Sequence, residues 1–136
     1  MNMTRRRVLL VALAIALRCA TAPVPTEPAR PVDLDFGRKA TFSDGLAVAL
    51  SRVVIDSRCP VGVTCIQAGD VVVELTANFR GSEQKVTVGL GPRGNPPNHA
   101  EVFGHVIERL KVGPDARTPP APANEYSVRI VVTPAS

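Results

Sequence analysis

The chain has 136 residues but no tryptophan, one tyrosine, four phenylalanines and two histidines. Without tryptophan it lacks the core residue typical of antibody domains. Valine, leucine, isoleucine and alanine must fill any interior. Both methionines, Met1 and Met3, stand at the very start, so we do not expect the histidine, cysteine and methionine ligands of a blue-copper site. We predict no metal and no cofactor.

Motifs of familiar reactions are also missing. The sequence has no Gly-x-Ser-x-Gly nucleophile turn, no His-Glu-x-x-His zinc motif and no glycine-rich phosphate loop. His99 and His105 stand apart from any recognisable nucleophile and orienting group, so we interpret them as surface residues. The sequence therefore predicts no catalytic residues, and a protein that is not an enzyme.

The one long apolar run lies near the start. Three arginines at residues 5–7 precede an unbroken apolar run at residues 8–17. This pattern is typical of a signal peptide, and the run is about half of the ~20 apolar residues that a membrane-spanning helix needs. Residues 4–9 also resemble a twin-arginine signal, which is the less favoured export route. We expect an exported protein that does not span the bilayer.

The leader offers two cleavage sites. The first is Ala16-Leu17-Arg18-Cys19, which approximates the box of a bacterial lipoprotein, although Arg18 stands where a small residue is usual. The second is Ala20-Thr21-Ala22, which suits ordinary signal peptidase but is followed at once by Pro23, a poor residue after the cut. We favour acylation of Cys19, which predicts a lipid anchor in a bacterial envelope membrane.

The chain divides into a leader (residues 1–19), a proline-rich tether (residues 20–31) and one domain (residues 32–136). The domain is long enough for a single core.

Four of the sixteen basic residues lie in the leader, which leaves twelve basic against twelve acidic residues beyond it. Because the remainder is close to neutral, we do not expect nucleic acid or an acidic membrane surface as a partner.

Cys59 and Cys65 remain as a pair once Cys19 is acylated or removed. Cysteines in an exported protein form disulfides, and Pro60 and Gly62 between them favour the turn that brings the sulfurs together. A structural zinc would need more ligands, and a redox pair is more often Cys-x-x-Cys. We therefore predict a structural disulfide that closes a short loop.

The same segment suggests a contact surface. Asp56 follows a predicted strand and is expected to accept backbone N–H bonds that hold the bend. Arg58 would then project from the closed loop toward a partner's carboxylate. The predicted partner-binding residues are Arg58, Pro60, Val61, Gly62, Val63 and Thr64, with Arg93 and Asn95 on a second loop.

Apolar alternation predicts strands throughout the domain. They are expected at residues 34–36, 40–42, 46–55, 71–79, 86–90, 102–110 and 126–132. About seven strands with turn residues between them, and no amphipathic helix, favour a single antiparallel β-sandwich. We expect it to be Greek-key and immunoglobulin-like, with a small closed β-barrel as the alternative.

The run Asp56-Ser57-Arg58-Cys59-Pro60, a second cysteine after a short gap, and Ala68-Gly69 before a strand make up a distinctive segment. It resembles a group of small exported bacterial proteins, many of them lipoproteins, without an assigned activity. That group often has tryptophan where this chain has Gln67, so a ligand-stacking role does not carry over. The resemblance implies a secreted β-domain and supplies no catalytic residues.

These features together predict a module exported to the periplasm or cell envelope and held there by lipid on Cys19. Its expected role is to bind an unidentified protein or other envelope partner, or to serve as a structural part of the envelope. The alternative is an inhibitor that inserts the disulfide loop into the cleft of an envelope or host enzyme.

Overall fold

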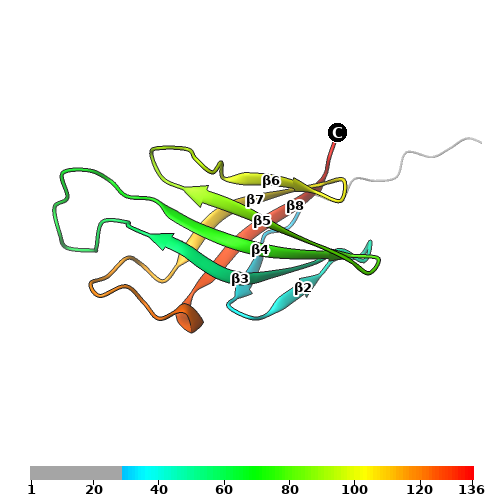
Figure 1. Cartoon of the computed structure of the whole chain (residues 1–136), viewed down its shortest axis with the longest axis horizontal. Coiled ribbons are helices and arrows are strands. Elements are labelled where there is room, and N and C mark those ends of the chain that lie inside the picture. The colour runs from blue at the N-terminus through cyan, green and yellow to red at the C-terminus, as the bar shows by residue number, and fades with distance from the viewer. Residues whose placement is uncertain (1–28) are drawn as a thin grey trace, which may run out of the picture.

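Two antiparallel sheets pack against each other in the computed structural model, which describes residues 29–136 (Figure 1). One sheet has the order β2-β3-β4-β5, and the other has the order β1-β8-β7-β6. The strands are β1 Val32–Asp35, β2 Lys39–Thr41, β3 Ala47–Asp56, β4 Val71–Phe79, β5 Ser82–Leu90, β6 His99–Val102, β7 His105–Gly113 and β8 Ser127–Pro134. The predicted β-sandwich is confirmed, and the two sheets do not close into a barrel.

The strand order is simpler than that of an immunoglobulin domain. In the β2-β3-β4-β5 sheet every strand pairs with the next one along the chain, and in the other sheet only β1 beside β8 breaks this rule. Immunoglobulin domains instead combine strands A, B, E and D in one sheet. The difference arises because hairpins join most neighbouring strands here, so the chain changes sheet only after β1 and after β5.

The core is aliphatic, as the shortage of aromatic residues requires. On β4, Val71, Val73, Leu75 and Ala77 alternate toward the interior and are completely buried. The same kind of alternation places Leu34 of β1 and apolar residues of β3 and β8 in the core with them. Each fully buried valine or leucine side chain contributes about 1.5–3 kcal/mol, so the alternation seen in the sequence is what holds the two sheets together.

The region 102–110, expected as one strand, is a hairpin. Phe103 and Gly104 form its turn with φ of 49° and 74°, and Val102 pairs with His105 across it. A two-residue hairpin turn with both central φ values positive matches the twist of the strands. The domain therefore has eight strands, one more than the seven ranges expected from the sequence. The two-residue turn also changes which positions face the core. Val102 is buried before the turn, and Ile107 and Arg109 are buried after it.

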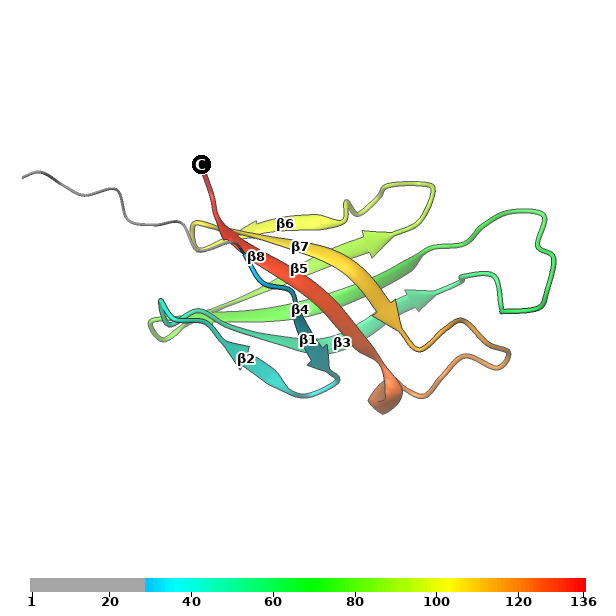
Figure 2. The same ribbon diagram turned by 180° about the vertical axis from the view of Figure 1, so that it is seen from behind.

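Three long loops gather at one end of the sandwich: residues 57–70, 91–98 and 114–126, the last containing the 3-10 helix η1 Ala123–Glu125. They lie at the left in Figure 1 and at the right in Figure 2, with short hairpins at the opposite end. Because Asp35 at the end of β1 pairs with Ser127 at the start of β8, the chain enters from the hairpin end. Within residues 29–136, no helix is long and apolar enough to cross a membrane.

Candidate functional site

Loop 57–70 is closed at two levels. Cys59 and Cys65 form the predicted disulfide, with Cα atoms 5.9 Å apart. Below it, the Ser57 backbone N–H donates to the Asp70 carbonyl at 2.8 Å, and the Asp70 N–H donates to Ser57 Oγ at 3.0 Å. Gly69 permits this approach, because a Cβ there would lie 1.5 Å from the Ser57 carbonyl oxygen. The loop is therefore fixed at its base as well as at its tip.

Asp56 and Arg58 form a two-pronged ion pair beside that base. Arg58 Nε lies 2.8 Å from Asp56 Oδ1, and Nη2 lies 2.7 Å from Oδ2. The Arg58 backbone N–H also donates to Oδ1 at 3.3 Å, which confirms the predicted role of Asp56 in holding the bend. Arg58 Nη1 and Nη2 then donate to the carbonyls of Val112 and Pro114 at 3.1 and 3.0 Å. The pair thus ties the loop to the end of β7 in the other sheet.

This placement corrects the expected role of Arg58. Its side chain is only 18% exposed, and Nε, Nη1 and Nη2 all donate to acceptors of the protein itself. The guanidinium turns inward because the carboxylate two residues earlier matches its fork. Arg58 is a link between the sheets and does not project toward a partner.

Tyr126, which directly precedes β8, completes the link. Its hydroxyl donates to Asp56 Oδ2 at 2.7 Å. Burial raises the pKa of the Asp56 carboxyl, but the hydrogen bonds from Arg58 and Tyr126 outweigh this and hold the pKa below its ordinary 3.8. Burial and the hydrogen bond to Asp56 raise the pKa of Tyr126. An ionised carboxylate and a protonated phenol therefore join the sheets at neutral pH.

The exposed part of the loop carries apolar side chains. Val61 is 74% exposed, Val63 is 56% exposed and Ile66 is fully exposed; we call these three residues the loop tip. The Val61 N–H donates to the Ala116 carbonyl at 3.0 Å, which attaches the tip to the neighbouring loop. Apolar side chains grouped on a fixed surface loop are typical of a contact site.

The other predicted contact residues take different positions. Gly62 and Thr64 are exposed beside the loop tip, whereas Pro60 is partly buried. Arg93 lines a hollow of about 360 Å³ together with Gln67, Ala68 and Pro92, between loops 57–70 and 91–98. Its Nε lies 3.5 Å from Asp70 Oδ2. Asn95 is exposed on the same loop but does not line this hollow.

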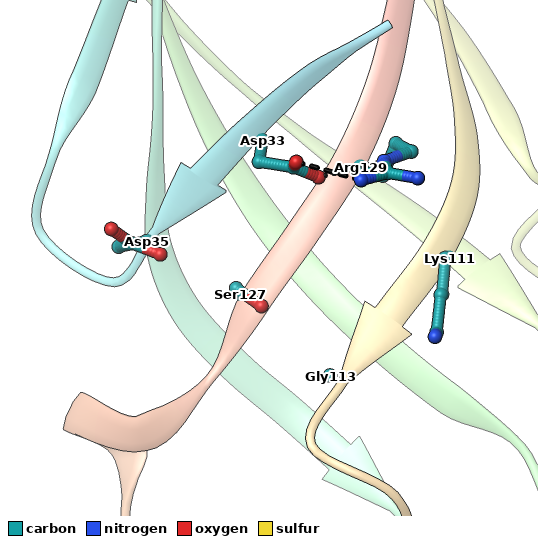
Figure 3. Close-up of a pocket in the computed structure, with 6 residues that line it drawn as sticks. All are labelled: Asp33, Asp35, Lys111, Gly113, Ser127 and Arg129. Carbon is teal, nitrogen blue, oxygen red and sulfur yellow. Dashed lines mark hydrogen bonds and ion pairs between the residues drawn. The ribbon is translucent and has the colours of Figure 1, made fainter.

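A second hollow lies on the outer face of the β1-β8-β7-β6 sheet. It measures about 320 Å³ and is lined by Asp33, Asp35, Lys111, Gly113, Ser127 and Arg129 (Figure 3). Asp33 accepts two hydrogen bonds of 2.8 Å from Arg129, which lower the pKa of its carboxyl. Charges of both signs alternate on this open face, as on an ordinary solvated surface.

The two histidines lie at opposite ends of the β6-β7 hairpin, His99 next to loop 91–98 and His105 beside the turn. His105 pairs with Asp44 at the hairpin end and packs edge-on against Phe79. His99 begins β6, next to Asn98. Among residues 29–136, no three His, Cys, Asp or Glu side chains gather closely enough to hold a metal ion. Cys19, the predicted lipidation site, lies outside the described residues.

Sequence reasoning missed two residues of this end of the molecule. Ile66 lies directly after Cys65, in a segment without alternation, and its isolation among polar and small residues was the available signal. Tyr126, the only tyrosine of the chain, begins the strand predicted at residues 126–132, and the residue is buried. The contact between its hydroxyl and Asp56 joins residues 70 positions apart, which no local pattern indicates.

Comparison with known proteins assigns neither family nor function: the chain matches no protein-family model, no curated protein and no solved structure.

Proposed function

We propose that this protein is an exported, lipid-anchored and non-enzymatic binding module of the bacterial cell envelope, and that it contacts a protein partner through the loop tip. The observation that carries the proposal is the exposure of Val61, Val63 and Ile66 on a loop held by a disulfide and by the Ala116 carbonyl. The disulfide also suits the oxidising compartment to which the leader points.

The energetics favour such a contact. Burying an exposed valine or isoleucine contributes about 1.5–3 kcal/mol, and a loop that is already fixed loses little conformational entropy on binding. Arg93 and Gln67 border the neighbouring hollow and would supply the polar rim that surrounds an apolar contact. The partner we infer therefore presents an apolar patch with an acidic or carbonyl group at its edge.

The course of the chain fits this orientation. The domain is entered from the hairpin end, and β8 also ends there, as the mark C in Figures 1 and 2 shows. A lipid on Cys19 would hold that end toward the membrane. The loop tip would then face away from the lipid surface, toward a partner in the periplasm or on a neighbouring envelope layer.

A photoreactive residue placed at Val63 tests the proposal in intact envelopes. We expect a defined crosslinked protein from this position that disappears when Val61 and Ile66 are replaced by serine. Gln84 is the matched control, because it is exposed on β5 near the hairpin end and should give no adduct. Equal crosslinking from both positions, or an adduct that survives the serine substitutions, would show that the loop tip is not the contact site.

A second function is favoured by the shape of the loop end. Loop 57–70 extends farther from the sheets than the other two loops in both views (Figures 1 and 2). An inhibitory loop that enters a cleft must extend in this way. Purified protein should then inhibit an envelope or host hydrolase in a panel assay, and the Val63→Asp variant should not. A simple binding module would leave every hydrolase of the panel unaffected.

A further inference from the structure

A hollow of about 250 Å³ lies beside the end of β3. One wall is formed by residues 53–56 of β3. The other wall is formed by Pro120, Ala121 and Ala123 of loop 114–126, which Figure 1 shows in orange below β3. Val54 and Ile55 are 37% and 52% exposed, although they belong to a strand of the sandwich. We call this hollow the β3 groove.

The β3 groove runs along the edge of the sheet and not over one of its faces. Val53 packs against the core, and the Asp56 carboxylate accepts a hydrogen bond from Tyr126, which precedes a strand of the other sheet. Val54 and Ile55 are instead exposed. Because the side chains of a strand project from both of its faces, residues from both faces line one hollow only where that hollow follows the edge.

This edge of β3 is open beyond Leu50. On the side away from β4, β2 pairs only with residues 47–49, and Phe36 forms a bridge to Leu50. Within residues 29–136, no strand pairs with residues 52–56 on that side, and no backbone hydrogen bond joins them to loop 114–126. The outward N–H and C=O groups here are those of an unpaired sheet edge. An extended segment of another chain can pair with such an edge.

The two walls determine what can enter. Because loop 114–126 bounds the β3 groove on the far side, one extended segment can lie against β3, but a second sheet cannot continue beyond it. Pro120 also lacks the backbone N–H that further pairing would need. Arg52, which directly precedes the lining residues, is exposed, and no carboxylate of residues 29–136 forms an ion pair with it. Its charge favours a segment with an acidic residue at that end.

We propose that the β3 groove binds a short extended segment of a partner protein as an added β-strand. The segment alternates apolar, β-branched residues with polar ones and carries an acidic residue next to Arg52. Backbone pairing with β3 supplies the affinity, and contact with Val54, Ile55 and Ala121 selects the apolar side chains. None of the loop-tip residues lines the β3 groove, so this site is separate from the contact proposed for the loop tip.

Titration of isotope-labelled wild-type protein with synthetic peptides, followed by NMR, tests the proposal. The probes are acetylated and amidated Glu-Val-Thr-Val-Thr-Val and its reverse, because an added strand can run in either direction. We expect one of them to shift the amide signals of residues 53–56 and Ala121 with a dissociation constant below about 1 mM. Only alternate N–H groups of an added strand face its neighbour. Methylation of one alternate set of peptide nitrogens should therefore abolish binding, and methylation of the other set should largely retain it.

Two pairs of variants locate the site. Ile55→Ser should weaken peptide binding at least about fivefold. Leu90→Ser is its control, because Leu90 is 45% exposed at the end of β5 in the same sheet, and should leave binding unchanged. Arg52→Gln should weaken binding about threefold through the lost ion pair. Lys85→Gln is its control, because Lys85 is an exposed base on β5, at the opposite edge of that sheet.

The proposal is overturned if neither peptide shifts the signals of residues 53–56, or if both methylation patterns have the same effect. Equal weakening by Ile55→Ser and Leu90→Ser would also overturn it, because the peptide would then bind elsewhere. Shifts of the same amides that grow with protein concentration in the absence of peptide would identify a second copy of this chain as the occupant, which likewise contradicts a partner segment.

Discussion

At the scale of single residues, the link made by Asp56, Arg58 and Tyr126 dominates the loop end. Asp56 comes from β3 in one sheet, Tyr126 directly precedes β8 of the other, and Arg58 reaches the end of β7. The donors and acceptors of this link are satisfied within the cluster, which is the condition under which a buried polar group stabilises a fold.

Replacing Asp56 with asparagine should lower the free energy of unfolding by about 3 kcal/mol at pH 7, because it leaves Arg58 partly buried without its counter-ion. The folded-state pKa of Asp56 lies below its ordinary 3.8. The stabilisation by its ionised carboxylate is therefore complete above the ordinary pKa and is lost as the pH falls through the folded-state pKa. Urea unfolding from pH 7 to pH 2 should show the gap between wild type and variant closing below about pH 4.

Asp33→Asn is the control for this experiment. Asp33 also pairs with an arginine, but on the surface, so its loss should change the free energy of unfolding far less than the loss of Asp56. A gap between wild type and Asp56→Asn that stays constant down to pH 2 would contradict the assignment of that stability to the ionised carboxylate.

At the scale of elements, loop 57–70 separates into a base and a tip. Ser57, Asp70 and Gly69 close the base through the backbone, whereas the disulfide restrains the exposed segment above it. The base continues the pairing of β3 with β4. The two closures therefore affect different properties: the base supports the fold, and the disulfide supports the shape of the loop tip.

Replacing both Cys59 and Cys65 with alanine should cost about 2 kcal/mol and leave the sheets intact. Gly69→Ala should cost more, because its Cβ would lie 1.5 Å from a backbone oxygen that cannot move alone. Far-ultraviolet circular dichroism and urea unfolding of both variants would check this order. Greater damage from the cysteine variant would mean that the disulfide, and not the backbone base, holds β3 and β4 together at this end.

At the scale of the whole molecule, the sandwich has two unlike ends. The three long loops and the polar link lie at one end, and the short hairpins, the entry of the chain and its C-terminus lie at the other (Figure 1). This polarity is what a module presented from a membrane requires. In the proposed module it would give the lipid anchor and the binding surface separate places.

The intact mass of protein recovered from a bacterial envelope tests the anchor. We expect a chain that begins at Cys19 and carries acyl groups, with two further thiols that react with an alkylating reagent only after reduction. An unacylated chain that begins downstream of Cys19 would contradict the anchor. Thiols at Cys59 and Cys65 that react before reduction would contradict the disulfide in the exported protein and reopen the metal and redox interpretations.

The sequence by itself determined the β-sandwich, the disulfide and most strand positions, because alternation and cysteine pairing are local or pairwise signals. The buried residues of β4 and β8 follow the apolar alternation from which these strands are predicted. Only the tertiary structure decided the direction of Arg58, the burial of Arg109 and the partner of Tyr126. The direction of Arg58 depends on a carboxylate and two carbonyls brought together from both sheets. The burial of Arg109 follows from the hairpin turn before β7, which changes the positions that face the core. The partner of Tyr126 follows from contact between residues far apart in the chain.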